Sequence, residues 1–141
     1  LTAKQLDQSL TAGAAFAVSP GATPALLDAG RGAPIPFLPG IATASEMMQA
    51  MDFGFDTFKL FPISALGENQ FIRILTGPFT EARFCCNGGL NLDLATRLLA
   101  EPSVLAVGAT WLTPPAAMAA GDWKAIESLA REACARLCTT P

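Results

Sequence analysis

Short runs of apolar residues recur along the whole chain at steps of 20 to 26 residues. Each run is followed by Gly or Pro and then by a signal for the start of a helix. This alternation predicts successive βα units on a parallel sheet. The near-continuous apolar character of the runs is typical of strands that are covered on both faces. The predicted strands lie at residues 15–18, 35–38, 57–61, 82–86 and 104–107.

Helix starts are marked between the apolar runs. Thr23 followed by Pro24 predicts an N-cap with proline at the first helical position, and residues 43–46 form a capping box. Asp122 precedes the longest predicted helix, residues 123–137. Its apolar stripe consists of Ile126, Leu129, Ala130, Ala133 and Leu137. Further helices are predicted at residues 1–10, 92–99 and 115–119.

Five parallel βα units allow two folds of the α/β class. They can form a small doubly wound sheet, or they can be the last five units of an eight-unit barrel, which normally needs about 200–250 residues. No linker or second domain is marked, so residues 1–141 are predicted to be a single domain. The chain opens on a helix without a preceding strand, and its first residue is Leu1. We therefore expect it to begin partway through a longer product.

Composition and charge exclude several classes of function. The 141 residues include 12 acidic and 9 basic side chains, a net charge of −3, and 51% of the residues are hydrophobic. This balance argues against disorder and against a nucleic-acid or anionic-membrane partner. No apolar run reaches the length of about 18 residues that a membrane span needs, and the start of the chain lacks the layout of a signal peptide. We expect a cytoplasmic protein with reduced thiols.

The residue types that are missing also limit the chemistry. The chain has no His and no Tyr, which excludes Ser-His-Asp and Cys-His nucleophile systems and His-containing zinc sites. Cys134 and Cys138 are four residues apart on a predicted helix and could hold a metal. Free cysteines are more often buried as small apolar side chains. We therefore predict that both face the core and that the protein has no metal site.

Lys59 lies in the middle of a predicted strand. In a strand it shares one face with Thr57 and Phe61. In one interpretation it is a structural lysine whose amine reaches water, and composition alone favours this role. In the other it is buried inside the sheet, where desolvation lowers its pKa and yields the neutral amine that attacks a carbonyl to form a Schiff base.

Two glycine-containing turns follow the last two predicted strands. Gly88 and Gly89 precede a predicted helix, so their backbone amides could bind an anion. Gly108 and Thr110 follow the next strand and supply further amides and a hydroxyl. In barrels, the loops after the last two strands frequently bind phosphate together. Simple turns without a ligand remain the alternative.

These residues stand in a longer set of motifs that is similar to one family. The chain resembles the class I aldolases for 2-keto-3-deoxy-6-phosphogluconate and 4-hydroxy-2-oxoglutarate over nearly its whole length. The segment Phe58-Lys59-Leu60-Phe61-Pro62 is the most specific part of the resemblance. The other matching stretches are residues 18–21, 38–43, 77–79, 83–85, 88–89, 108–112 and 120–123.

The resemblance implies a (β/α)8 TIM barrel in which the visible runs are strands four to eight. It makes Lys59 the Schiff-base lysine, and it gives Gly88, Gly89 and Thr110 a role in phosphate binding. It also implies that the substrate is a keto-acid phosphate cleaved to pyruvate and glyceraldehyde 3-phosphate, that no cofactor is needed, and that the full-length protein is a homotrimer. Pro20 then lines the active site, and Asn87 replaces a family threonine but can still donate a hydrogen bond to the substrate.

The chain also departs from the family pattern. The strands that carry the family's catalytic glutamate, an arginine and a carboxylate-binding threonine fall upstream of Leu1, so no residue here takes those roles. Residues 64–70 differ from the family's small, Gly-rich turn. Two alternatives therefore stay open. One is an aldolase for unphosphorylated 4-hydroxy-2-oxoglutarate, and the other is an inactive barrel fragment that binds anions.

Overall fold

The computed structural model describes residues 1–137, and in this part of the chain strands and helices alternate. Every predicted apolar run contains a strand, so the predicted βα pattern is confirmed. The strands are β1 Ala17–Val18, β2 Phe37–Leu38, β3 Gly40–Ile41, β4 Thr57–Leu60, β5 Arg83–Asn87 and β6 Val104–Gly108. The helices are α1 Ala3–Thr11, α2 Pro24–Arg31, α3 Ala44–Asp52, α4 Ile63–Leu66, α5 Glu68–Thr76, α6 Leu92–Leu99, α7 Pro115–Ala120 and α8 Trp123–Leu137, with a 3₁₀ turn, η1, at Thr110–Leu112.

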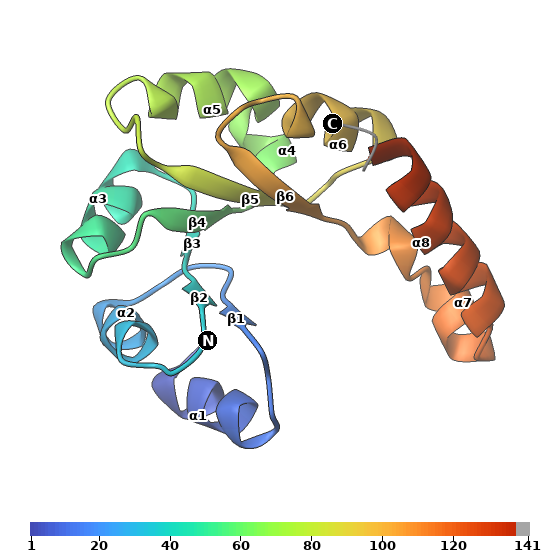
Figure 1. Cartoon of the computed structure of the whole chain (residues 1–141), viewed down its shortest axis with the longest axis horizontal. Helices are drawn as coiled ribbons and strands as arrows, with labels where there is room; N and C mark the ends of the chain where they lie inside the picture. The colour runs from blue at the N-terminus through green and yellow to red at the C-terminus, as the bar shows by residue number, and fades with distance from the viewer. Residues whose placement is uncertain (138–141) are drawn as a thin grey trace.

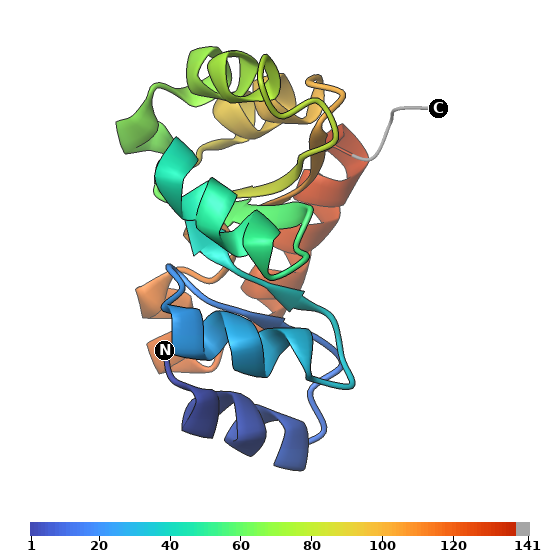
Figure 2. The ribbon, with the colours of Figure 1, turned by 90° about the vertical axis from the view of Figure 1, so that its left-hand side faces the viewer.

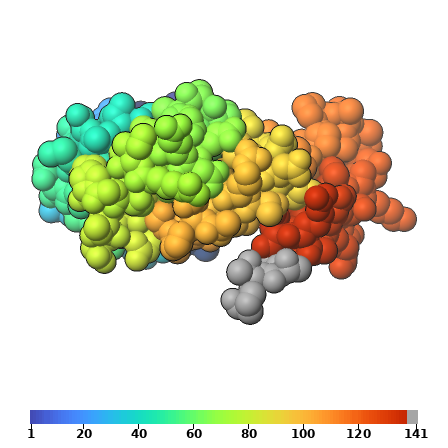
Figure 3. Space-filling model, turned by 90° about the horizontal axis from the view of Figure 1, so that it is seen from above, coloured from blue at the N-terminus to red at the C-terminus, as the bar shows by residue number. Residues whose placement is uncertain are grey.

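The strands form a curved inner layer with helices along its outer side (Figure 1). All strand pairs are parallel, and their order is β1-β2 followed by β3-β4-β5-β6. A doubly wound sheet reverses its strand order at a switch point, and the described strands show no reversal. Helices α1, α2 and α3 lie side by side on the outside (Figure 2). From above, α5 and α6 form one surface and α8 lies beside α6 (Figure 3).

The second apolar run contains β2, and a further short strand, β3, begins directly after Pro39. Strand β2 pairs with β1, whereas β3 pairs with β4. Proline has no backbone N–H and cannot donate to a strand ladder, but the Pro39 carbonyl still accepts a hydrogen bond from the Lys59 N–H at 2.9 Å. The ladder is therefore interrupted while the chain continues in the same direction.

Two apolar clusters lie behind the strands. The smaller one joins Leu6, Leu26 and Phe37, from α1, α2 and β2. The larger one surrounds β4 and β5, where alternate side chains are completely buried against the helices; these are Phe58, Leu60, Phe84 and Cys86. Because neighbouring residues of a strand point to opposite faces, the residues between them, such as Lys59, lie on the concave face and are half-buried.

The predicted caps account for four of the eight α-helix starts in the described residues. Side-chain oxygens of Thr23, Thr43, Asn91 and Asp122 accept hydrogen bonds from backbone N–H groups in the first turns of α2, α3, α6 and α8. Helix α5 was not expected, because it begins at Gly67 with φ of +100° and without a side-chain cap. A left-handed glycine between two helices leaves no capping pattern that a sequence would reveal.

The prediction that Cys134 faces the core is wrong, because its side chain on α8 is exposed. The surrounding stripe explains the difference: Ala133 takes the buried position of this helical turn. Cys138 lies outside the described residues. Within residues 1–137, no three metal-ligating side chains cluster. None of the helices in this part of the chain combines the length and apolar character needed to cross a membrane.

Candidate functional site

A pocket of about 320 Å³ lies at the carboxyl ends of β4, β5 and β6. Parallel strands bring their carboxyl ends to the same edge, which is where ligands bind in α/β proteins. Two larger hollows, of about 390 and 500 Å³, contain no lysine. The pocket brings together five of the predicted site residues. It is lined by Lys59, Phe61, Asn87, Gly88, Gly89, Gly108, Ala109 and Thr110.

Lys59 lies in the centre of the curved strand layer. Its register partners are Gly40 on β3 and Cys85 on β5. Its Nζ lies 4.8 Å from the centroid of the Phe61 ring, where the ring face attracts a cation. The ion pairs of the described residues all use arginine, so none of them involves Lys59. The amine therefore faces the pocket without an acidic partner there.

The thiol beside Lys59 stays protonated near neutral pH. Burial raises the pKa of Cys85, and the nearby Lys59 charge opposes this effect without cancelling it. The Cys85 thiol donates a hydrogen bond to Asn87 Oδ1 at 3.5 Å. Burial raises the pKa of Cys86, on the opposite face, to about 12. Because the thiolate is the reactive form of cysteine, neither thiol competes with the amine as a nucleophile.

The turn after β5 is shaped to present backbone amides. Gly88 and Gly89 have φ of +92° and +73°, a conformation that glycine adopts without strain. Among the described residues, neither N–H donates to a backbone carbonyl. A Cβ on Gly88 would lie 2.9 Å from the Phe61 ring and from Pro62 Cα. The turn therefore packs closely on the segment that follows Lys59, with two amide donors left free for an anion.

The loop after β6 closes the other side of the pocket. Thr110 is exposed at the start of η1. A Cβ on Gly108 would collide with the side-chain amide of Asn87, so this amide lies directly against β6. Asn87 thus sits between the glycine turn and the Thr110 loop. Together these groups can donate several hydrogen bonds to one anion.

Pro20 does not line this pocket. It is exposed, and its backbone lies against Gly40, where a Cβ would collide with the Pro20 carbonyl. Since Gly40 is the register partner of Lys59, Pro20 is separated from the amine by β3. Phe61 lines the pocket without having been predicted as a site residue, although the alternation along the strand puts it on the same face as Lys59. Ser64, beside the glycine turn, was not predicted either, because no sequence signal marks it.

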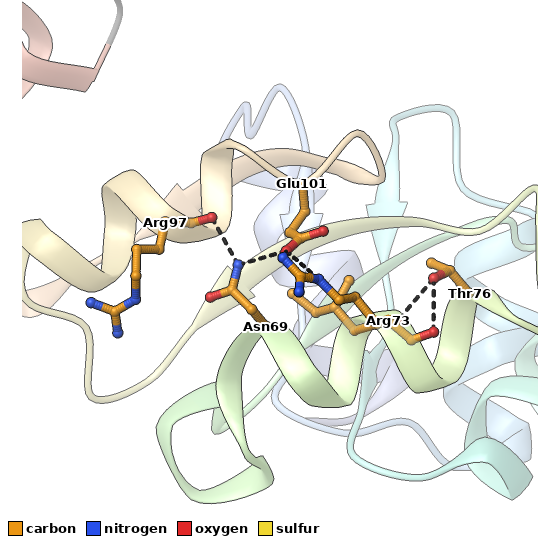
Figure 4. A network of polar contacts seen from close by, with 6 residues as sticks. Asn69, Arg73, Thr76, Arg97 and Glu101 are labelled. Atoms are coloured by element: carbon orange, nitrogen blue, oxygen red, sulfur yellow. Dashed lines mark hydrogen bonds and ion pairs between the residues drawn. The ribbon is translucent and has the colours of Figure 1, made fainter.

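A second polar cluster joins α5 to α6 and to Glu101 just after it (Figure 4). Glu101 Oε1 accepts hydrogen bonds from Arg73 Nε and Asn69 Nδ2, both at 2.9 Å. Asn69 also donates to the Arg97 carbonyl at 2.8 Å. The hydrogen bond from Arg73, followed by that from Asn69, lowers the pKa of Glu101. Arg97 also pairs with Glu68 at 2.8 Å, so the cluster has two positive and two negative charges, and it serves to join the two helices.

Comparison with known proteins gives a consistent result. The family model "KDPG and KHG aldolase" matches residues 1–129. The 2-dehydro-3-deoxy-phosphogluconate aldolase of Dickeya dadantii is 46% identical over 132 residues, covering 94% of this chain and 62% of that protein. The KHG/KDPG aldolase of Escherichia coli is 45% identical over 133 residues, with the same coverage. The chain therefore spans about 62% of the length of these relatives.

Solved structures show the same likeness. The KDPG aldolase of Legionella pneumophila, with pyruvate captured as a covalent carbinolamine intermediate, matches with a TM-score of 0.88 and 37% identity. The match covers 92% of this chain and 63% of that one. The Zymomonas mobilis 2-keto-3-deoxy-6-phosphogluconate aldolase with 3-phosphoglycerate matches with a TM-score of 0.86 and 38% identity, covering 94% of this chain and 62% of that one.

Proposed function

The chain belongs to the KDPG and KHG aldolase family, and from this premise we propose that it is part of a Schiff-base aldolase. Its proposed reaction is the cleavage of 2-keto-3-deoxy-6-phosphogluconate to pyruvate and glyceraldehyde 3-phosphate. One observation carries the proposal: a single pocket holds both the unpaired amine of Lys59 and the free amides of the Gly88-Gly89 turn. A 2-oxo acid that ends in phosphate needs both of these groups.

Lys59 is the proposed nucleophile. Its neutral amine attacks the C2 ketone to give a carbinolamine, which loses water to form an iminium ion. The iminium accepts the electron pair of the C3–C4 bond as that bond breaks and a base takes the proton of the C4 hydroxyl, which releases the aldehyde and leaves an enamine. Protonation of the enamine at C3 and addition of water to the resulting imine release pyruvate and restore the amine. The covalent pyruvate adduct of the Legionella relative supports this assignment.

The phosphate is proposed to bind at the other end of the pocket. The backbone amides of Gly88 and Gly89, the side-chain amide of Asn87 and the hydroxyl of Thr110 are its proposed hydrogen-bond donors. Pro20 is proposed only to form a wall of the active site on the side of β3 that faces away from Lys59. The Escherichia coli relative is named KHG/KDPG aldolase. Of these two substrates, only the phosphorylated KDPG would use this end of the pocket.

We further propose that residues 1–141 are one incomplete domain and that its strands correspond to strands four to eight of a (β/α)8 barrel, with β2 and β3 together forming strand five. The parallel strands in consecutive order and the 62% coverage of relatives support this proposal. The group that moves protons and the groups that hold the substrate carboxylate then belong to the remaining strands. The family resemblance also supports a homotrimer and a cytoplasmic location for the full-length protein.

Reductive trapping tests the proposal. The full-length protein is incubated with pyruvate and borohydride, and the adduct is mapped by mass spectrometry. We expect the adduct on Lys59 and its loss in Lys59→Arg. Lys4 and Lys124 are the internal controls, because they are the other lysines of the chain. An adduct on either of them, with Lys59 unmodified, contradicts the assignment.

A further inference from the structure

The segment that follows Lys59 folds over the glycine turn. Phe61 and Pro62 lie against Gly88, and Ser64 lies against Gly89, where a Cβ would collide with the Ser64 hydroxyl. The Ser64 N–H donates a hydrogen bond to the Gly88 carbonyl at 3.3 Å. The segment directly after the strand that carries the amine therefore holds the turn that presents the amides.

The Ser64 side chain can affect the pocket only indirectly, through its contact with Gly89. Ser64 is exposed at the start of α4, and it is not among the residues that line the pocket. Its hydroxyl occupies the space beside the Gly89 Cα that a larger residue would fill with its own side chain. It is thus placed to limit the movement of Gly89 without contacting a bound ligand.

We propose that Ser64 is a positioning residue for the anion-binding turn, and that it raises the affinity for the phosphate end of the substrate. This inference rests on the proposed function. Glycines lose more conformational freedom on ordering than any other residue, so two consecutive left-handed glycines form a rigid pair of donors only if their neighbours hold them. The backbone hydrogen bond of Ser64 fixes Gly88, and its hydroxyl restrains Gly89. Without the hydroxyl, part of the binding free energy is spent on ordering the turn.

The test compares Ser64→Ala with Ser64→Thr, which keeps the hydroxyl, and with Ser128→Ala, an exposed serine on α8. Inorganic phosphate is titrated into each full-length variant, and the amide signals of Gly88 and Gly89 are followed by NMR. We expect Ser64→Ala to raise the Kd for phosphate about 3- to 10-fold. Ser64→Thr and Ser128→Ala should stay within about 2-fold of the unaltered protein.

Pyruvate trapping at Lys59 in the same variants separates positioning from general damage. Pyruvate has no phosphate, so its trapping rate should differ less than about 2-fold between the Ser64 variants. Equal Kd values for Ser64→Ala and the unaltered protein overturn the inference. Equal losses in phosphate binding and in pyruvate trapping also overturn it, because Ser64 would then serve the whole site.

The two proposals fail in different ways. If the unaltered protein does not trap pyruvate but Ser64→Ala still weakens phosphate binding, the proposed function fails and the role of Ser64 stands. If trapping is normal and phosphate binding does not depend on Ser64, the role fails and the proposed function stands. If the unaltered protein does not bind phosphate at the turn, the role of Ser64 is overturned.

Discussion

At the residue scale, the environment of Lys59 follows from the alternation of side chains along β4. Phe58 and Leu60 anchor the strand in the core, so Lys59 must point into the concave face. There it meets the Phe61 ring and the thiol of Cys85 rather than a carboxylate. Among the described residues the Lys59 amine has no ion-pair partner that it would have to leave before it reacts.

Gly89→Val should separate the two ends of the pocket. The side chain would occupy the space of the Ser64 hydroxyl and force the turn out of its left-handed conformation. We expect the KM for the phosphorylated substrate to rise at least about 10-fold, while pyruvate trapping changes less than about 2-fold. Steady-state kinetics and borohydride trapping measure the two effects.

Gly54→Val is the matched control for this substitution. Gly54 has a similar φ of +89°, but no atom lies within 4 Å of a Cβ built on it. It therefore carries the same backbone strain without a collision near the site. Equal losses in both assays for Gly89→Val would mean that the glycine serves only the turn.

At the element scale, several helices could be predicted because a single capping side chain marks where each of them begins. Thr23, Thr43 and Asn91 cap helices as expected. Helix α5 could not be predicted, since its start depends on the left-handed Gly67 and on tertiary contacts. All strands except β3, and the place of Lys59 on β4, could be predicted from local patterns. The contact between Ser64 and Gly89 could not be predicted, because it joins segments that follow different strands.

The stability that the Glu101 contacts between α5 and α6 provide should depend on pH. The Glu101 side chain is 12% exposed, and hydrogen bonds from Arg73 and Asn69 lower its pKa in the folded protein. A carboxyl group whose folded pKa is lowered stabilises the native state above its unfolded pKa. This contribution is lost as the pH falls through the folded pKa. We expect Glu101→Gln to lower the Tm by about 2–4 °C at pH 7, with the difference vanishing in acid.

Thermal melts between pH 7 and pH 3 measure this effect. Glu127→Gln is the control, because Glu127 forms an exposed pair with Arg131 on α8. Such surface pairs contribute little, so its Tm should change by less than about 1 °C. A Tm difference for Glu101→Gln that stays constant down to pH 3 would contradict the role of its ionised form.

At the scale of the whole molecule, the strand layer has two open sides. Among the described strands, β1 pairs only with β2 and β6 pairs only with β5. Their outer backbone groups form templates for pairing with another chain. Apolar side chains lie at both edges, with Val18 exposed on β1 and Leu105 exposed on β6. The pattern of apolar runs could not decide between the last five units of a barrel and a doubly wound sheet, because strand order is set by packing between distant elements.

We expect the 141-residue chain to self-associate through these edges and to show little aldolase turnover. Leu105→Lys places a charge on the β6 edge and should shift sedimentation velocity profiles toward the monomer. Ile74→Lys is the matched control, since Ile74 on α5 is 62% exposed and Leu105 is 61% exposed. A monomeric chain that unfolds cooperatively and is as active as an intact relative would contradict the truncated-barrel proposal.

The break at Pro39 implies that the protein has two levels of local stability. Residues 1–38 hold the small cluster of Leu6, Leu26 and Phe37 and share no continuous ladder with β4. A unit with few buried contacts opens at a lower free energy than the main core. In native-state hydrogen exchange, amides of α1, whose buried residue Leu6 belongs only to the small cluster, should therefore lose protection well before those of Phe58 and Phe84. Equal protection would mean that the interrupted ladder still transmits cooperativity. If the protection of the two parts differs, residues 1–38 can unfold locally as a separate cooperative unit while Lys59 keeps its place on the remaining sheet.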